Sequence, residues 1–512
     1  MNRICAIYML GAALAAGLWS CSSGSDEPLV AEADYVRLSV PEAIIEVSPE
    51  GGDVVIGFTS NKDWRAETPG ANGYVNGVLQ QDGGSAGVNE VIFTATPNTG
   101  MTARQTNVRI SAGRASAEVS LRQEVLPIDL PDEAQVREYL MRLFDDTDGP
   151  NWRFKGRWGS DLPLSQWGSE VKYENGRLEL NLAEHYLKGK IDLSGCKALV
   201  SIKCSVNQIS ELDLSDCPLL TYVDCTNTGL ERIDLSGCHS LRRLSVPFNN
   251  LTHIDIGWSK TLSELYVHNC RLESLDLSQC VSLQTLSCHT NCLQTLDVPQ
   301  RRMLVDVFCY GNDLTRLELG GSPQLQVLNC GENGISELNV RGCPRLRWIY
   351  CHDNRLADLD VTDQKGSLAH YYCFSNNLTR LDLTGYSELS ELHCSDNDIC
   401  ELLVGGCRRL GWLYCSYNRL ETLDLSTIDP DLTRLDISFN RLREIDLDPF
   451  IRLVHLWCQG NRIGGEIPER FDRLEDFEHD ARYEYMPSSG TYIDRGYGWW
   501  YPGEPESFRH TR

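Results

Sequence analysis

Residues 325–345 have the sequence L-Q-V-L-N-C-G-E-N-G-I-S-E-L-N-V-R-G-C-P-R, and variants of it recur thirteen times between Leu199 and Ile463, 21 residues apart except for two steps of 22. Its first cysteine belongs to a column that is cysteine in ten of thirteen copies: Cys204, Cys225, Val246, Val267, Cys288, Cys309, Cys330, Cys351, Cys373, Cys394, Cys415, Ile437 and Cys458. A fixed period of this length predicts a repeat architecture.

The opening of each copy, L-x-x-L-x-C, alternates apolar and polar residues and therefore predicts a short strand with one buried face. One such strand cannot bury that face alone, but copies stacked about 4.8 Å apart form a parallel sheet over a continuous core. A second apolar pair, such as Leu212 and Leu214, closes each coil on its outer side. No copy has room for a helix of useful length. We therefore predict an all-β dominated solenoid over residues 178–463.

A second column lies three residues after the first and is asparagine in eleven of thirteen copies: Asn207, Thr228, Asn249, Cys270, Asn291, Asn312, Asn333, Asn354, Asn376, Asn397, Asn418, Asn440 and Asn461. Asparagine at this point can hydrogen-bond the backbone of its own turn and of the neighbouring coil, where amides would otherwise lack partners. We expect looser turns at Thr228 and Cys270, which break the column.

These columns resemble the leucine-rich repeat, and the cysteine column is similar to the short repeats of internalin-type adhesins that carry a cysteine ladder. The resemblance covers about half of the chain and implies a capped solenoid whose parallel sheet lines a concave surface.

The chain has 21 cysteines, which in an exported protein would ordinarily indicate a disulfide framework. Ladder cysteines point the same way from adjacent parallel strands, a poor match to the crossed geometry of a disulfide. We therefore expect free thiols packed as small apolar side chains. Disulfides among Cys270, Cys292 and Cys400 are the alternative. A metal site is disfavoured because no paired C-x-x-C spacing occurs.

The net charge of -25 and the pI near 4.9 argue against binding to nucleic acid and against electrostatic docking on anionic lipid. At the N-terminus, Arg3 precedes an apolar run from Ile4 to Trp19, as in a secretory signal. The sequence L-W-S-C that ends at Cys21 resembles the lipobox of bacterial lipoproteins. This resemblance implies a signal peptide over residues 1–21, lipidation of Cys21, a tether over 22–33 and an anchored position at the outer membrane or cell surface. An ordinary signal peptide with a chance cysteine is the alternative.

Residues 34–126 contain six or seven short alternating segments separated by turns, which predicts an antiparallel β-sandwich. The stretch from Gly51 to Trp64 and the closing L-R-Q resemble the BACON domain of Bacteroidetes surface proteins. That resemblance implies a carbohydrate site, for which Asn61 and Trp64 would be the candidates. The alternative, which we favour, is that Trp64 fills the core and the sandwich is a spacer.

Residues 127–177 and 464–512 flank the repeats. A helix is expected from Asp132, with Val136, Leu140 and Leu143 on one face, and the following T-D-G-P-N-W resembles the N-terminal cap of extracellular leucine-rich repeat proteins. The last segment is rich in Tyr and Trp and is predicted to cap the final coil, the alternative being a binding or assembly patch.

Residues between the buried positions of each strand face the concave surface. Aromatic side chains crowd there in copies six to thirteen, and we hypothesise a ligand site centred on Trp348, Tyr350, Tyr372, Phe374, Trp412, Tyr414 and Trp457. The alternative is lateral stacking of rings that only stiffens the sheet.

An aspartate column, which includes Asp213, Asp234 and Asp424, follows the outer strands, and we expect turn amides to compensate its charge, with calcium as the alternative. No catalytic elbow, phosphate loop or isolated His and Glu constellation occurs, so we predict no enzymatic activity, no cofactor and no metal. The predicted function is recognition of a protein or glycan by a monomer on the cell surface. The alternatives are carbohydrate binding through the sandwich and a purely structural role in the envelope.

Overall fold

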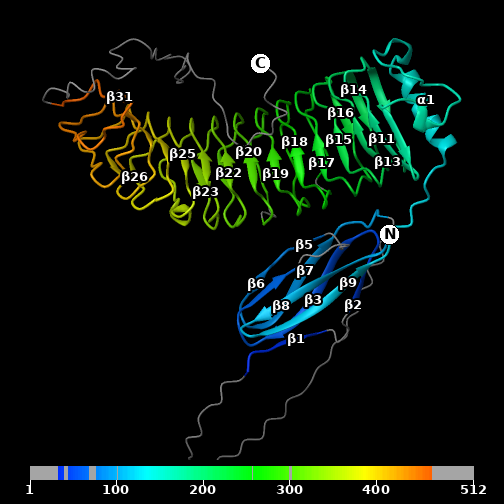
Figure 1. Cartoon of the computed structure of the whole chain (residues 1–512), viewed down its shortest axis with the longest axis horizontal. Coiled ribbons are helices and arrows are strands. Elements are labelled where there is room, and N and C mark those ends of the chain that lie inside the picture. Colours follow the sequence, from blue (N-terminus) through cyan, green and yellow to red (C-terminus); the bar gives the residue numbers. More distant parts are fainter. Residues whose placement is uncertain are drawn as a thin grey trace, which may run out of the picture.

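The computed structural model describes residues 33–39, 44–68, 77–100, 102–256, 258–298 and 302–463. They form a β-sandwich and a long curved solenoid, with the sandwich beside the N-terminal half of the solenoid (Figure 1). The predicted lipidation site Cys21, the tether and the aromatic segment 464–512 lie outside the described residues. Within the described part of the chain, no helix is long and apolar enough to cross a membrane.

The sandwich pairs a four-stranded sheet with a five-stranded sheet, as predicted, but the described residues contain nine strands rather than six or seven, and one pairing in the second sheet is parallel rather than antiparallel. The first has the order β1-β3-β7-β5 and the second β2-β9-β8-β4-β6. The strands are β1 (Val36–Leu38), β2 (Ile44–Val47), β3 (Gly52–Ser60), β4 (Trp64–Glu67), β5 (Gly77–Leu79), β6 (Gly83–Gly84), β7 (Gly87–Ala95), β8 (Arg104–Ala112) and β9 (Ala115–Gln123). Buried apolar side chains such as Phe58, Phe93 and Leu121 fill the space between the two sheets.

The open end of the solenoid is covered by helix α1 (Glu133–Asp146) and two 3-10 turns, η1 (Gly149–Asn151) and η2 (Leu164–Gln166). Asp132 caps α1 by accepting a hydrogen bond from the Gln135 N–H, and the Gln135 side chain accepts from the Asp132 N–H in return. Val136, Leu140 and Leu143 of α1 are buried in the same apolar core as the first coils. The helix thus covers apolar surface that the first coil would otherwise expose.

The inner face of the solenoid is one sheet of fifteen strands. It opens with an antiparallel pair, and every later pairing is parallel, with neighbouring residues 21 or 22 positions apart. The strands are β10 (Val171–Glu174), β11 (Arg177–Asn181), β13 (Leu199–Lys203), β15 (Tyr222–Asp224), β17 (Arg243–Ser245), β18 (Glu264–Tyr266), β19 (Thr285–Ser287), β20 (Asp306–Phe308), β22 (Val327–Asn329), β24 (Trp348–Tyr350), β25 (His370–Tyr372), β27 (Glu391–His393), β29 (Trp412–Tyr414), β30 (Arg434–Asp436) and β31 (His455–Trp457). The predicted all-β solenoid is confirmed.

The outer side of the coils carries further strands in three small parallel sheets. They are β12 (Lys188–Asp192), β14 (Gln208–Asp213), β16 (Arg232–Asp234), β21 (Arg316–Glu318), β23 (Glu337–Asn339), β26 (Arg380–Asp382) and β28 (Glu401–Leu403). The only helical segment described between residues 178 and 463 is the 3-10 turn η3 (Thr362–Gln364), which lies in one of the two coils of 22 residues. One extra residue is therefore absorbed on the outer side without disturbing the inner register.

Asparagine side chains join neighbouring coils inside the solenoid. Asn312 is representative: its Nδ2 donates to the carbonyls of Cys288 at 3.2 Å and Cys309 at 3.0 Å, and its Oδ1 accepts from the Leu293 N–H at 3.0 Å. The residue before each asparagine takes a left-handed φ in most coils, as Asp353 does at 50°. The asparagine thus supplies partners to backbone groups that the turn leaves without a ladder bond.

The two interruptions of the column do not loosen their turns, so that expectation is wrong. The Thr228 hydroxyl donates to the Cys225 carbonyl at 3.3 Å, and the Cys270 thiol donates to the Val246 carbonyl at 3.4 Å. The preceding residues, Asn227 and Asn269, have φ values of 54° and 51°, within the range of the other coils. A hydroxyl or a thiol replaces part of the asparagine bonding because the surrounding coils hold the turn in place.

The expectation that ladder cysteines are all free thiols is also wrong. Cys204 and Cys225 form a disulfide with their Cα atoms 5.0 Å apart. Stacking brings adjacent ladder residues to a separation that a disulfide spans, so the parallel direction of the side chains does not exclude a bond between them. The later column cysteines from Cys288 to Cys415 are free and buried, and Cys270, Cys292 and Cys400 are free as well.

A second cysteine column lies on the outer side of the coils. The thiols of Cys217, Cys238 and Cys407 donate to carbonyls of the preceding coil, those of Leu193, Leu214 and Leu383, at 3.1 to 3.3 Å. Burial raises the pKa of Cys238 to about 12. These thiols stay protonated and act as weak hydrogen-bond donors.

The aspartates of the outer column are compensated by their own turns, as expected. Asp213 Oδ1 accepts from the Ser215 N–H at 2.9 Å and from its hydroxyl at 2.7 Å, and Asp234 does the same with Ser236. At Asp360, bonds from the Thr362 hydroxyl and N–H and from Arg341 lower the pKa to about 2. Hydrogen bonds to the charged form thus hold these carboxylates ionised.

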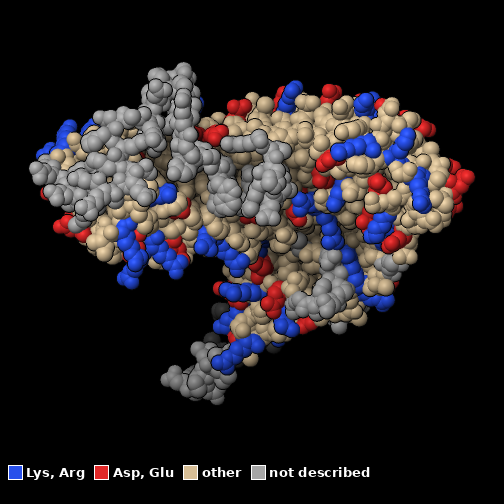
Figure 2. Space-filling model, turned by 45° about the horizontal axis from the view of Figure 1, so that its top comes forward, with Lys and Arg blue, Asp and Glu red and all other residues tan. Residues whose placement is uncertain are grey.

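Ion pairs join the sandwich to the flank of the solenoid. Lys260 pairs with Asp53 at 3.4 Å, and Arg302 pairs with Asp82 at 2.5 Å. Figure 2 shows basic and acidic side chains interspersed over the visible surface of both parts. Pairs between neighbouring coils, such as Arg419 with Asp398 at 2.5 Å, distribute the charge along the solenoid.

Candidate functional site

The inner sheet has one face in the core and one face toward the concave surface. In β22 and β24 the central residues Leu328 and Ile349 are fully buried in the core, and the residues on either side of each point the other way. Register pairs align these outward positions into rows, such as Asn329 beside Tyr350. The concave lining is therefore made of the first and last residues of each inner strand and of the residue that follows the ladder position.

The structure places all seven predicted site residues in this lining. Trp348, Tyr372, Phe374, Trp412, Tyr414 and Trp457 are half-buried. Tyr350 is only 4% exposed, and so are two other lining rings, Tyr266 at 4% and Phe308 at 3%. These three rings are not part of the solenoid core but are shielded from solvent, because rings from coils about 4.8 Å apart cover one another.

Lateral contacts connect most of the rings. The ring centroids of His352 and Phe374 are 4.5 Å apart with planes 2° apart, and Phe374 stacks on His393 at 4.3 Å. In the next row, Tyr350 lies 4.9 Å from Tyr372. The lining thus forms rows of stacked rings along the solenoid, with half-exposed faces toward the groove.

Arginine side chains cover two of the tryptophans. The guanidinium of Arg434 lies 4.2 Å from the ring centroid of Trp412, and that of Arg347 lies 5.0 Å from the ring of Trp348. Each contact is a cation–π pair within the usual range. Tryptophan and arginine together are the side chains most enriched at the centres of protein interfaces.

A polar cluster lies between these tryptophans. Glu391 accepts hydrogen bonds from His370, at 3.1 Å from Nδ1, and from the Tyr372 hydroxyl. Burial alone would raise the pKa of Glu391, but these hydrogen bonds outweigh it and leave the pKa lowered. Burial and the bond to Glu391 both raise the pKa of Tyr372. The cluster fixes Tyr372 at the centre of the aromatic surface with its hydroxyl protonated.

The N-terminal half of the lining contains a second cluster that sequence reasoning did not single out. Arg243 pairs with Glu264 at 2.7 Å and lies 4.9 Å from the ring of Tyr266 and 5.7 Å from the ring of Tyr222. Glu264 also accepts from the Tyr266 hydroxyl at 3.1 Å. Alternation of arginine, glutamate and tyrosine at equivalent positions of neighbouring copies is the sequence signal that could have identified it.

Three histidines of the lining, His268, His289 and His393, are held in their neutral form. His268 stacks on His289 at 4.3 Å, and His289 stacks on Tyr310 at 4.2 Å. Burial lowers the pKa of His268 to about 3 and, together with the neighbouring His268, that of His289 to about 2. Burial likewise lowers the pKa of His393 to about 3. These rings therefore serve as flat neutral surfaces at neutral pH.

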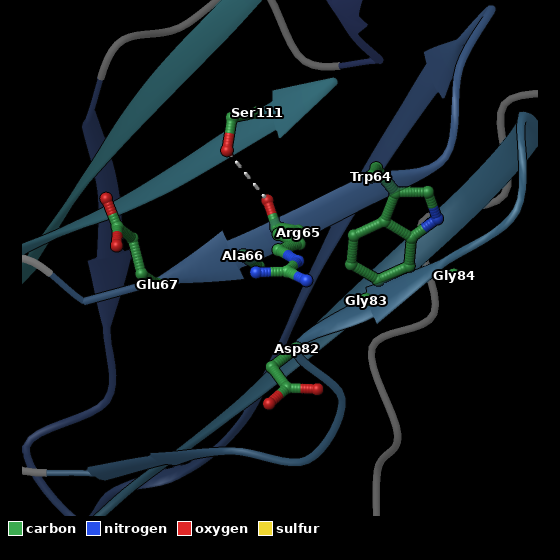
Figure 3. Close-up of a pocket in the computed structure, with 8 residues that line it drawn as sticks. All are labelled: Trp64, Arg65, Ala66, Glu67, Asp82, Gly83, Gly84 and Ser111. Carbon is green, nitrogen blue, oxygen red and sulfur yellow. Dashed lines mark hydrogen bonds between the residues drawn. The ribbon is translucent and has the colours of Figure 1, made fainter. Parts of the chain in front are cut away.

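The carbohydrate candidates of the sandwich have structural contacts. Trp64 is 2% exposed and packs edge-on against Phe58 at 4.9 Å. Asn61 accepts a hydrogen bond from the Tyr35 N–H at 2.9 Å and donates one to the Ala33 carbonyl at 3.1 Å. These bonds hold the segment that leads into the first strand of the sandwich. A shallow pocket between β4, β6 and β8 is lined by Trp64, Arg65, Ala66, Glu67, Asp82, Gly83, Gly84 and Ser111 (Figure 3). Asp82 in its wall is the partner of Arg302, so the pocket borders the contact with the solenoid.

No family model and no curated protein matches this sequence. Among solved structures, the functional domain of InlJ from Listeria monocytogenes, which includes a cysteine ladder, is 28% identical over 56% of this chain and 68% of its own, with a TM-score of 0.48. YopM, a leucine-rich effector protein from Yersinia pestis, is 22% identical over 66% and 98%, with a TM-score of 0.47. The internalin InlF from Listeria monocytogenes is 16% identical over 65% and 96%, with a TM-score of 0.48.

The fold class rests on the coil geometry itself. Leucine-rich copies of 21 residues, a continuous parallel inner sheet and an asparagine turn in each coil define a solenoid of the leucine-rich repeat type. Its concave lining carries the aromatic rows and the polar clusters described above, and it is therefore the candidate site.

Proposed function

We propose that this protein is a non-enzymatic recognition protein of the cell surface that binds a protein partner on the aromatic concave lining. The observation that carries the proposal is the set of half-buried rings Trp348, Tyr372, Phe374, Trp412, Tyr414 and Trp457, arranged in rows and partly covered by arginine. Such side chains bring large contact area at low entropic cost because stacking already fixes their rotamers. Tyr350, beneath them, supports the rows.

Lipidation at Cys21 and display at the outer membrane belong to the same proposal. They are supported by the sequence L-W-S-C after an apolar run and by the polar, acidic segment that follows it. An anchored solenoid would present its groove to molecules outside the cell.

Carbohydrate binding through the sandwich is the second candidate. It is supported by the pocket beside Trp64, whose buried Nε1–H has no hydrogen-bond partner among the described residues. We favour the concave lining because its rings offer exposed faces, whereas Trp64 is buried in the sandwich core.

The test replaces Trp348, Tyr372 and Trp412 by alanine together in the full chain and measures binding to protein and glycan arrays. Loss of these three side chains should reduce binding to any protein ligand at least about a hundredfold, since central aromatic side chains contribute most of the energy of an interface. A matched control replaces the exposed Arg316, Arg380 and Arg419, which lie outside the lining, by alanine. Circular dichroism verifies that both variants are folded.

A folded triple variant that binds as tightly as the unaltered protein would refute the concave site. Binding of glycans by residues 34–126 alone, with none by residues 127–512, would favour the sandwich instead.

A further inference from the structure

Acidic side chains of the concave lining differ in whether they have partners. Asp224 accepts from the Thr226 N–H and hydroxyl, Asp436 accepts from the same groups of Ser438, Glu264 pairs with Arg243 and Glu391 with His370. Asp306 is the exception: among the described residues its carboxylate has neither a hydrogen-bond nor an ion-pair partner, although it is half-buried. Among the acids of the lining, it is therefore the one whose charge no described protein group balances.

Asp306 lies at the first position of β20, in register with Val327 of β22 and, one strand further, with Trp348 of β24. Its other neighbour in the row is Thr285. Burial raises the pKa of Asp306 to about 6. No basic side chain occupies this row between Thr285 and Trp348, so the carboxylate is not compensated along the row.

Two hydrogen-bond donors in the two coils that follow Asp306 are also without partners. The Nδ2 of Asn329 and the Nε1–H of Trp348 are buried and donate to no described residue. Asn329 is in the coil between Asp306 and Trp348, and only its Oδ1 is used, by the Gly331 N–H at 3.3 Å. Three consecutive coils thus hold one unpaired carboxylate and two unpaired donors in a lining whose other acids are paired.

We propose that Asp306 anchors a lysine or arginine side chain of the protein partner, while Asn329 and Trp348 donate to carbonyl oxygens of the same partner segment. This inference rests on the proposed function and specifies the chemistry of the partner. A cation restores the missing charge partner through charge-assisted hydrogen bonds, which are the stronger kind. The overall charge of -25 also favours a basic partner, because it attracts one at long range and repels an acidic one.

The probe is an array of decapeptides with a fixed central arginine and randomised flanks, together with the same array carrying neutral citrulline at that position. The full chain should bind a subset of arginine peptides at least about tenfold more tightly than their citrulline counterparts, in line with the strength of hydrogen bonds to charged groups. Asp306→Asn should lose this tenfold preference. Glu264→Gln is the matched control, since it removes a lining carboxylate that already has partners, and it should keep the preference.

Thermal stability separates an anchor from a structural carboxylate. A half-buried carboxylate without a protein partner adds no bond to the folded state, so Asp306→Asn and Asp306→Ser should melt at the same temperature as the unaltered chain or above it. Lower melting temperatures in both variants would overturn the proposal, because Asp306 would then have a structural partner.

The remaining outcomes are also decisive. Equal loss of binding in Asp306→Asn and Glu264→Gln would show a general charge effect and overturn the anchor. Neutral glycans that bind the unaltered chain but not Asp306→Asn would assign the carboxylate to sugar hydroxyls and overturn a basic partner. If peptides bind without preferring arginine, yet binding is lost when Trp348, Tyr372 and Trp412 are replaced, the anchor fails and the proposed function stands. If that triple variant binds normally, the proposed function itself fails.

Discussion

The core face and the concave face of the inner strands follow different rules, although they alternate along the same residues. On the core side, leucine, cysteine and asparagine recur from coil to coil with the same hydrogen bonds, as Asn312 and Asn333 illustrate. On the concave side, equivalent positions are occupied by Asp306, Val327 and Trp348 in three successive coils. Stacking fixes the first face and leaves the second free to vary, so a specific function can be carried there without changing the fold.

The largest effect that would test this difference is expected in the asparagine column. Asn312→Leu removes the partner of the Leu293 N–H and one of the two amide donors to each of the Cys288 and Cys309 carbonyls, which keep Asn291 and Asn333. A buried N–H left without a partner costs about 1 to 3 kcal/mol, and each of the two lost bonds to the carbonyls adds about 1 kcal/mol, so we expect a loss of about 4 kcal/mol in the free energy of unfolding. Urea denaturation followed by circular dichroism measures it.

Two further variants sharpen this prediction. Asn377→Leu changes an exposed asparagine outside the column and should leave stability within about 0.5 kcal/mol. Cys270→Asn should raise stability by about 1 kcal/mol, because an amide bonds the neighbouring backbone more strongly than a thiol does. If Asn312→Leu were as mild as Asn377→Leu, the core side would not depend on its asparagines.

The second largest effect is expected from removal of the Cys204–Cys225 disulfide, since the other described cysteines of the ladder are free thiols. The double variant replaces Cys204 and Cys225 by valine, which removes the disulfide. Packing should change little, because the same column already has valine at Val246 and Val267. Closing a loop of this length stabilises a protein by about 3 kcal/mol, so we expect a loss of that order under oxidising conditions. Mass spectrometry of alkylated protein counts the free thiols, and a pair of free thiols at these positions would contradict the disulfide.

The sequence predicts which residues lie on the core face and which on the concave face, but it does not predict the contacts between coils. The repeat phase placed Leu328 and Ile349 in the core and Trp348 and Tyr372 in the groove, because a period of two leaves no other arrangement once copies stack. Contacts between coils could not be predicted. The burial of Tyr350, the disulfide at Cys204 and the lack of a partner for Asp306 all depend on which residues lie 21 positions away.

The contacts of the sandwich were likewise beyond the sequence pattern. The ion pairs of Asp53 with Lys260 and of Asp82 with Arg302 join residues more than 200 positions apart in surface turns that no periodicity marks. By contrast, burial of Trp64 could be predicted, because a tryptophan in a sandwich usually fills the core.

The smallest effect is expected from the protonation of a single lining histidine, His393, as the pH falls. The pKa of His393 is lowered by burial to about 3 in the folded protein, against about 6.5 when the chain is unfolded. Between these values the unfolded chain binds the extra proton, so the stability that neutral His393 supplies is present above pH 6.5 and is lost as the pH falls. Linkage gives a loss of at most about 2 kcal/mol between pH 7 and pH 5 for this residue.

His393→Phe keeps a ring against Phe374 and should reduce the acid-induced loss by about that amount, measured by urea denaturation at both pH values. Tyr414→Phe, which alters a neighbouring ring without a proton that titrates in this range, should leave the difference between the two pH values unchanged. An unchanged pH dependence in His393→Phe would mean that the ring is reached by water, and the concave lining would then be more open than its stacked rows indicate.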